Sequence, residues 1–174
     1  ITIDTIHLGG LKKLFDEALS VYPELTVGLS VGTRPDCLDQ EKIDLLESYS
    51  HRVDVDLELG LESIHDKTLS VINRGHSHAE FLEAVDMIRG RKLRLGVHTI
   101  FGFPTESRED MLAVAEVVNR LPLHFIKLHH LHVVNVSIMA HEYRNNPFPL
   151  FSLEDYGVFL ADFLPRLRPD LVVQ

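Results

Sequence analysis

Cysteine and long apolar runs are scarce in this sequence, and each scarcity excludes a class of protein. Cys37 is the one cysteine among 174 residues. A single cysteine excludes an internal disulfide, and also a metal centre that this chain alone would build from several thiolates. No apolar run approaches the roughly 20 residues of a membrane span, and no segment has the layout of a signal peptide. We therefore expect a cytoplasmic protein with no membrane partner.

Positive charge is also scarce, since the formal net charge is −9 at pH 7. Non-specific binding of nucleic acid needs a basic surface, so this balance weighs against it. The longest basic run, residues 89–94, has two readings. It is either a solvated helix end, where cations suit the helix dipole, or a contact for RNA. The substrate therefore stays unknown at this stage, either RNA or a small molecule.

Helical and strand-like segments alternate along a chain of ordinary single-domain length. Apolar spacing and capping residues predict helices over 11–20, 39–49, 64–71, 77–89, 107–121 and 152–164. Strand patterns predict strands over 25–32, 53–61, 93–101 and 124–134, with a further one near 171–174. Such alternation predicts an α/β fold with a parallel sheet and helices outside it.

The second predicted strand has one polar face, formed by Asp54, Asp56, Glu58, Gly60 and Glu62. Carboxylates cannot pack under helices, so this face meets either a polar barrel interior or solvent at a sheet edge. The third strand adds Arg94 and His98, and the fourth adds Lys127 and His129, or alternatively Leu128, His130 and His132. Because polar residues recur on one face in successive strands, we favour a partial parallel (β/α) barrel with a charged lumen.

The two ends of the sequence lack the context of a complete barrel. Residues 1–10 show no clear cap or strand pattern, and residues 171–174 form an apolar run that would leave an unpaired strand edge. We therefore expect a piece of a longer protein, whose open edges could also support a homo-oligomer.

Three ordered strings carry a family resemblance: residues 30–38, residues 58–63 with the following 68–76, and residues 98–106, with 127–132 beyond them. Together they resemble the radical S-adenosylmethionine (SAM) family of enzymes similar to the Elongator catalytic subunit, most closely its bacterial Fe–S oxidoreductase branch. The resemblance implies a TIM-like (β/α)6 barrel, of which residues 1–174 form a single partial domain of about four βα units. The units that bind the cluster would precede residue 1.

This sequence departs from the family pattern at three points. Glu62 replaces a usual Gln, Thr105 replaces a usual Gly, and residues 135–137 replace a usual Lys-Gly-Thr. The first two changes affect individual cofactor contacts rather than the predicted fold.

The resemblance implies SAM and a 4Fe–4S cluster as cofactors of the full-length parent, with a 5′-deoxyadenosyl radical that takes a hydrogen atom from the substrate. This chain would carry part of the SAM and substrate surface but not the cluster site. We expect neither cofactor to bind tightly to the isolated chain, which should have no radical activity.

The resemblance assigns SAM contacts to Glu62, Arg74, Ile100, Gly102, Phe103 and Pro104. A guanidinium fork suits a carboxylate, but Arg74 could equally pair with Glu58 or Glu62. The Gly-Phe-Pro string would also turn the strand into the next helix without any cofactor.

Substrate or lumen contacts are expected from Arg34, Asp56, Glu58, His98, Lys127 and His129. A charge-balanced interior network would explain the same residue types, and Arg34 could cap a helix or pair with Asp39. No catalytic residue is assigned.

Two other functions remain open. A metal-dependent barrel hydrolase could use His124, His129, His130 or His132 with carboxylates, but their spacing fixes no third ligand, so we predict no metal site. A non-catalytic or degenerate barrel module that self-associates is the other alternative.

Overall fold

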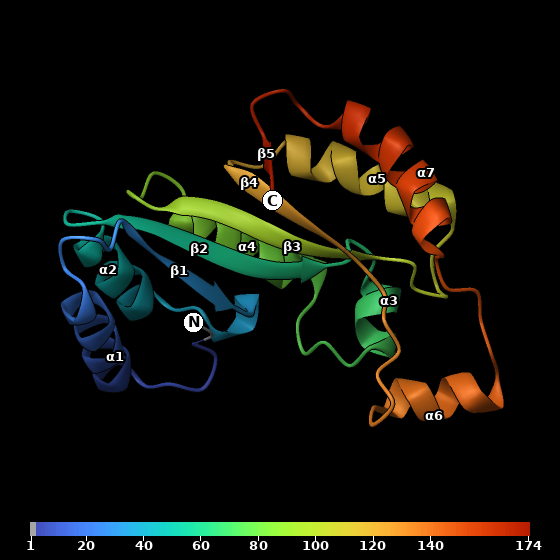
Figure 1. Ribbon diagram of the computed structural model, residues 1–174, viewed down its shortest axis with the longest axis horizontal. Coiled ribbons are helices and arrows are strands. Elements are labelled where there is room, and N and C mark those ends of the chain that lie inside the picture. The colour runs from blue at the N-terminus through green and yellow to red at the C-terminus, as the bar shows by residue number, and fades with distance from the viewer. Residues whose placement is uncertain (1–2) are drawn as a thin grey trace.

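The computed structural model describes residues 3–174 as a parallel sheet with helices between its strands (Figure 1). The strands are β1 (Gly28–Thr33), β2 (Asp54–Glu62), β3 (Arg94–Phe101), β4 (Phe125–His130) and β5 (Val172–Val173). They lie side by side in chain order, and every neighbouring pair is parallel. The predicted α/β class and parallel sheet are confirmed.

Seven α-helices connect these strands or flank them in the described part of the chain. They are α1 (Leu8–Val21), α2 (Gln40–Tyr49), α3 (Asp66–Val71), α4 (His78–Ile88), α5 (Arg108–Asn119), α6 (Ile138–Asn145) and α7 (Leu153–Phe163). The predicted caps Asp39, Ser77, Ser107 and Ser152 each accept a hydrogen bond from a backbone N–H three residues on. These bonds satisfy donors that a helix leaves free at its first turn.

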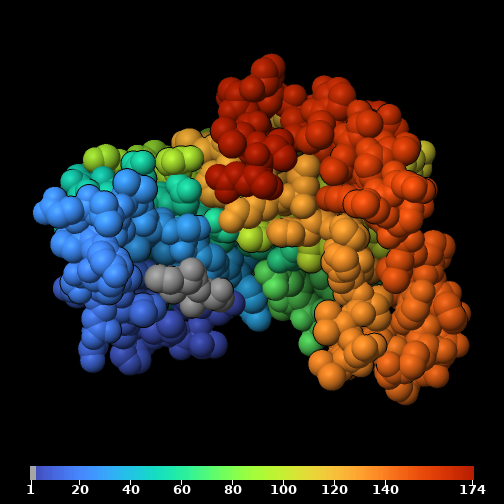
Figure 2. Space-filling model, in the orientation of Figure 1, coloured from blue at the N-terminus to red at the C-terminus, as the bar shows by residue number. Residues whose placement is uncertain are grey.

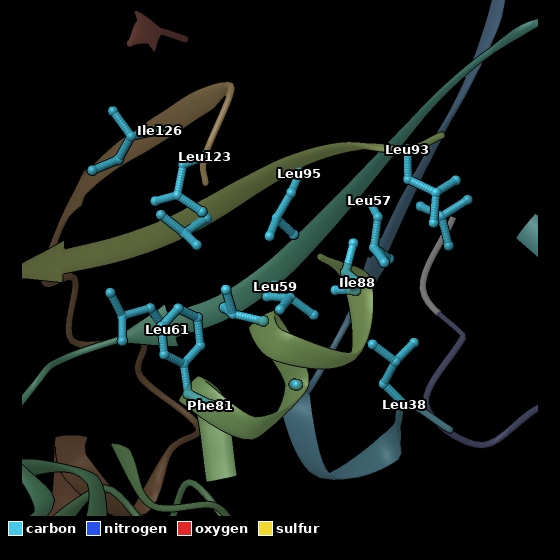
Figure 3. Close-up of a cluster of buried hydrophobic side chains, with 14 of the residues drawn as sticks. Leu38, Leu57, Leu59, Leu61, Phe81, Ile88, Leu93, Leu95, Leu123 and Ile126 are labelled. Atoms are coloured by element: carbon cyan, nitrogen blue, oxygen red, sulfur yellow. The ribbon is translucent and has the colours of Figure 1, made fainter. Parts of the chain in front are cut away.

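The main core lies between the sheet and the helices that cover its outer face. Leu57, Leu59 and Leu61 of β2 are fully buried, and Figure 3 shows them beside Phe81 and Ile88 of α4. The alternating residues of β2 lie on the opposite face, where Glu58 and Glu62 are found. The predicted division of β2 into a helix-facing side and a polar side therefore holds.

The segment after β4 differs most from the sequence prediction. The strand was expected to reach residue 134 but ends at His130, and α6 was not predicted. Backbone N–H of Ser137 donates to the carbonyl of Val134, and the Ser137 side chain then caps α6. Strand β3 ends at Phe101, which pairs with His130, so β4 has no β3 residue left to pair with beyond that point. Figures 1 and 2 show α6 and its flanking residues at the lower right of the molecule.

Smaller differences occur near the N-terminus. The first strand begins at Gly28 rather than residue 25, and α1 begins at Leu8 because the Nδ1 atom of His7 accepts from the backbone of Gly10. Within the poorly matching stretch 1–10, residues 1 and 2 lie outside the described residues. No helix in the range 3–174 combines the length and apolar character needed to cross a bilayer.

Candidate functional site

A carboxylate on β2 forms the centre of the polar face of the sheet. Glu58 Oε1 accepts hydrogen bonds from Ser30 Oγ of β1 at 2.5 Å and from Lys127 Nζ of β4 at 2.7 Å. Its other oxygen, Oε2, lies 2.5 Å from His98 Nε2 of β3. Parallel pairing in register brings these four strands together, so one buried carboxylate joins side chains from all of them.

The hydrogen bonds decide the ionisation of Glu58. Burial alone would raise the pKa of this carboxyl, but bonds from Lys127, Ser30 and His98 outweigh it and hold the pKa at about 2.

Beside this cluster the His129 ring lies 5.3 Å from the ring of His98, and burial lowers the pKa of His129. Lys127 and His129 therefore share the polar face, which resolves the two alternatives for β4. Asp56 lies next to them, in an ion pair with Arg94 at 3.3 Å.

A second ion pair lies where β2 ends. Arg74 Nη2 is 2.8 Å from Glu62 Oε1. The Arg74 guanidinium therefore pairs with Glu62 rather than with Glu58, the other predicted partner. The guanidinium passes directly over Gly60, where an added Cβ would lie 2.1 Å from Nη2. Glu62 has φ +57°, a left-handed conformation that is costly for a side chain other than glycine, and the register with β3 shifts between Gly60 and Glu62. Burial raises the pKa of Glu62.

Arg34, the first residue after β1, lies at the same end of the lumen. Its Nε donates to Asp36 Oδ1 at 3.0 Å and its Nη2 contacts Asp36 Oδ2, so the alternative in which Arg34 pairs with Asp39 is not the one that the structure shows. The two carboxylate oxygens of Asp36, two residues away, match the planar fork, whereas Asp39 caps α2.

The backbone N–H of Arg34 donates to Asp4 Oδ1 at 2.8 Å. Arg34 and Asp4 line a cavity of about 240 Å³ together with Glu58, Glu62, Arg74 and His98.

The turn after β3 lines a different cavity. Gly102 has φ +98° and donates its backbone N–H to Met111 Sδ at 3.1 Å, while Phe151 packs against its α-carbon side. Gly102, Phe103 and Pro104 border about 460 Å³ of space between the starts of α5 and α7. Ile100 is not part of this lining; it pairs in register with His129 on β4. Of the residues predicted to contact SAM, Glu62 and Arg74 therefore line the first cavity, Gly102, Phe103 and Pro104 line the second, and Ile100 lines neither.

Direct side-chain contacts join the second and third sequence strings. Ser63 Oγ donates to Glu106 Oε1 at 2.5 Å, and the hydroxyls of Thr68 and Thr105 are 2.8 Å apart. The first string reaches the second where the Arg34 guanidinium lies over Gly75, with 2.9 Å to an added Cβ. Strings far apart in sequence thus meet at the carboxyl ends of the strands, where barrel sites are built.

The histidines form no metal centre in the described residues. No group of three or more His, Cys, Asp or Glu side chains within 3–174 is arranged to hold an ion. His124 Nδ1 accepts from the backbone of Leu95, and His130 and His132 contact each other with ring centroids 4.1 Å apart. These contacts give the hydrolase alternative no support.

Sequence reasoning missed two residues of the polar cluster. Ser30 stands between Leu29 and Val31 in β1, so period-two alternation could have placed its hydroxyl on the face of Glu58. Asp4 accepts from the side chain of Thr33 and the backbone of Arg34, but nothing in the local sequence signals that role.

The chain matches the radical SAM superfamily over residues 8–118 and the radical SAM C-terminal domain over residues 123–174. It is 34% identical over 165 residues to an uncharacterized protein of Methanocaldococcus jannaschii, covering 94% of this chain and 51% of that protein. It is 37% identical over 163 residues to YhcC of Escherichia coli K12, covering 93% and 52%. The chain therefore spans about half the length of these relatives.

Solved structures share the fold at low sequence identity. The Elp3 protein of Methanocaldococcus infernus superposes with a TM-score of 0.75 at 18% identity, over 85% of this chain and 35% of that one. The radical SAM methyltransferase TsrM of Kitasatospora setae gives 0.69 at 16%, over 96% and 42%. These neighbours are TIM-like barrels, of which the present sheet corresponds to a part.

Proposed function

The chain belongs to the radical SAM superfamily, and from this premise we propose that it forms the SAM- and substrate-binding part of an Fe–S oxidoreductase. One observation carries the proposal: the family strings bring Glu62, Arg74, His98 and Glu58 to a single polar cavity at the carboxyl ends of β1–β3. Bound SAM supplies hydrogen-atom abstraction from a substrate in this superfamily, and the protein binds and orients the reactants.

Arg74 and Glu62 fit the polar groups of SAM. The Arg74 side chain lines this cavity and is 26% exposed, so N–H groups of its fork that do not bond to Glu62 can donate to an acceptor such as the SAM carboxylate. Glu62 offers carboxylate oxygens that accept from ribose hydroxyls. Its left-handed backbone supports a functional role, since such strain is found mainly at binding and catalytic sites.

The 4Fe–4S cluster does not fit the residues of this sequence. The family holds the cluster through three cysteines, whereas the 174 residues contain Cys37 alone. Cys37 lies in a short 3-10 helix after β1, where burial raises the pKa of its thiol and so disfavours the thiolate that iron requires. The cluster ligands would come from elsewhere in the parent protein.

The ion pairs of the basic run favour a small polar substrate over RNA. The arginines of the basic run are paired with carboxylates: Arg89 with Asp86 at 3.0 Å, Arg91 with Glu47 at 2.6 Å and Arg94 with Asp56. This pairing supports reading the run as a helix end. The relative named tRNA uridine(34) acetyltransferase, from Dehalococcoides mccartyi, is 30% identical over 130 residues, but the chain covers only 28% of it.

Titration with SAM tests this function. We expect weak binding to the isolated chain, with a Kd on the order of 1 mM, because the cluster and its neighbouring SAM contacts would lie outside this sequence. Arg74→Met should weaken binding by at least about tenfold, since it removes a charge-assisted hydrogen bond. NMR shift perturbation of the labelled chain would measure both.

Arg89→Met is the matched control, because it also removes an arginine from an ion pair but on the exposed end of α4. It should bind SAM as the unaltered chain does. Equal SAM binding by the Arg74→Met and Arg89→Met variants would remove the support for this site.

A second substitution, Gly60→Ala, also tests the SAM site. The three atoms nearest to the new methyl group belong to the ends of the Arg74 and Glu62 side chains rather than to the backbone, so the strand should survive while the ion pair is displaced. We expect SAM-induced shifts to disappear, with a loss of no more than about 1 kcal/mol in the free energy of unfolding. A variant that binds SAM normally would show that the Arg74 position over Gly60 does not matter.

A further inference from the structure

The hydrogen bonds of Glu58 fix the state of the neighbouring imidazole. Glu58 is ionised, and an ionised carboxylate can only accept hydrogen bonds. His98 Nε2, 2.5 Å from Glu58 Oε2, must therefore be the donor. In the neutral ring this leaves the proton on Nε2 and an unshared electron pair on Nδ1.

The other contacts hold Glu58 in place rather than competing for His98. Ser30 and Lys127 both donate to Oε1, so Oε2 is left for the imidazole. The Glu58 side chain is 8% exposed while that of His98 is 31% exposed, so the pair has a buried anchor and an accessible ring. His98 Nδ1 makes no hydrogen bond to any part of the chain between residues 3 and 174.

From this arrangement we propose that His98 is a proton-transfer residue of the substrate site, with Glu58 as the residue that positions it. The proposal rests on the proposed function, because the substrate would lie in the cavity that His98 lines. A base oriented by a buried carboxylate on its far nitrogen is the arrangement that recurs in enzymes that move protons at substrates.

The step balances within the site. A substrate O–H or N–H gives its proton to Nδ1, and the electron pair of that bond stays on the substrate oxygen or nitrogen. The imidazolium formed is stabilised by the negative charge of Glu58. The other ionisable groups near the ring are Lys127 and His129 of β4. The cavity wall adds Asp4, Arg34, Glu62 and Arg74.

A histidine with a purely structural role would make the same hydrogen bond to Glu58, but its Nδ1 atom would not react readily as a nucleophile. Diethyl pyrocarbonate is a suitable probe, since it acylates the unprotonated imidazole nitrogen and mass spectrometry can count each histidine. The reaction is run above the imidazole titration range, so that rates report nucleophilicity rather than charge. His51, exposed in a turn after α2, is the internal reference.

We expect Glu58→Gln to slow acylation of His98 on the order of tenfold while His51 is unaffected, because the orienting negative charge is lost. Arg89→Met, which removes an ion pair at the exposed end of α4, should leave the His98 rate unchanged. An unreactive His98 in the unaltered chain, or equal rates in the unaltered and Glu58→Gln chains, would overturn the proposal.

A second measurement needs no variant and so does not depend on folding of Glu58→Gln. Nitrogen-15 NMR of the histidine rings should find His98 with its proton on Nε2 and none on Nδ1. A proton on Nδ1 would refute the proposal. Normal SAM binding with either negative result would overturn only the role of His98, whereas loss of SAM binding with a reactive His98 would overturn only the proposed function.

Discussion

Replacing Gly96 by alanine is expected to lower the free energy of unfolding by about 3 kcal/mol. Gly96 of β3 pairs with Phe125 of β4, and the Phe125 ring lies over it so closely that an added Cβ would be 2.0 Å from a ring carbon. The ring is fully buried, so it has no free space into which it could rotate. Either the ring or the two strands must shift, and both cost packing energy.

Gly157→Ala is the matched control for this substitution. Gly157 lies inside α7, and an added Cβ there would meet no atom within 4 Å. The same chemical change should therefore stabilise the protein by about 0.5 to 1 kcal/mol through helix propensity. Urea denaturation would measure both variants. A Gly96→Ala protein as stable as the unaltered one would mean that Phe125 does not occupy the space above Gly96.

Acid should destabilise the protein partly through Glu58. Its pKa is about 2 in the folded state, against 4.5 for an ordinary glutamate, so the unfolded chain takes up the proton first. The stabilisation is therefore complete above about pH 4.5 and is lost as the pH falls towards 2. For a shift of this size the linked change is about 3 kcal/mol. Denaturation series at several pH values should show this difference between the unaltered chain and Glu58→Gln.

Glu62→Gln provides a control of opposite sign. Burial raises the pKa of Glu62, so here the folded state takes up the proton before the unfolded state does. Its contribution should become more favourable as the pH falls, and the difference between unaltered and Glu62→Gln proteins should move the other way. Two variants with the same pH dependence would contradict the separate environments assigned to these glutamates.

Much of the sheet could be predicted because local rules and the final packing agree. The alternation of β2 predicted which side chains face the helices, and serine or aspartate caps predicted where helices begin. These patterns are short-range, so they can be read without knowing the partners across the sheet.

The rest depended on contacts between distant segments. The choice of Asp36 over Asp39 by Arg34, the donation of Ser30 to Glu58 and the ring of Phe125 over Gly96 are set by register and side-chain geometry. The end of β4 at His130 follows from the end of β3 at Phe101, the residue with which His130 pairs. The left-handed Glu62 has no signal in sequence, since glutamate rarely adopts that conformation.

The polar network of Glu58 also shows that the two faces of β2 have separate roles. Its side chain bonds to other lumen residues, while Leu57 and Leu59 on either side pack against the helices. Substitutions at the polar positions of β2 are therefore expected to change the charge of that face without disturbing the packing between the sheet and its helices.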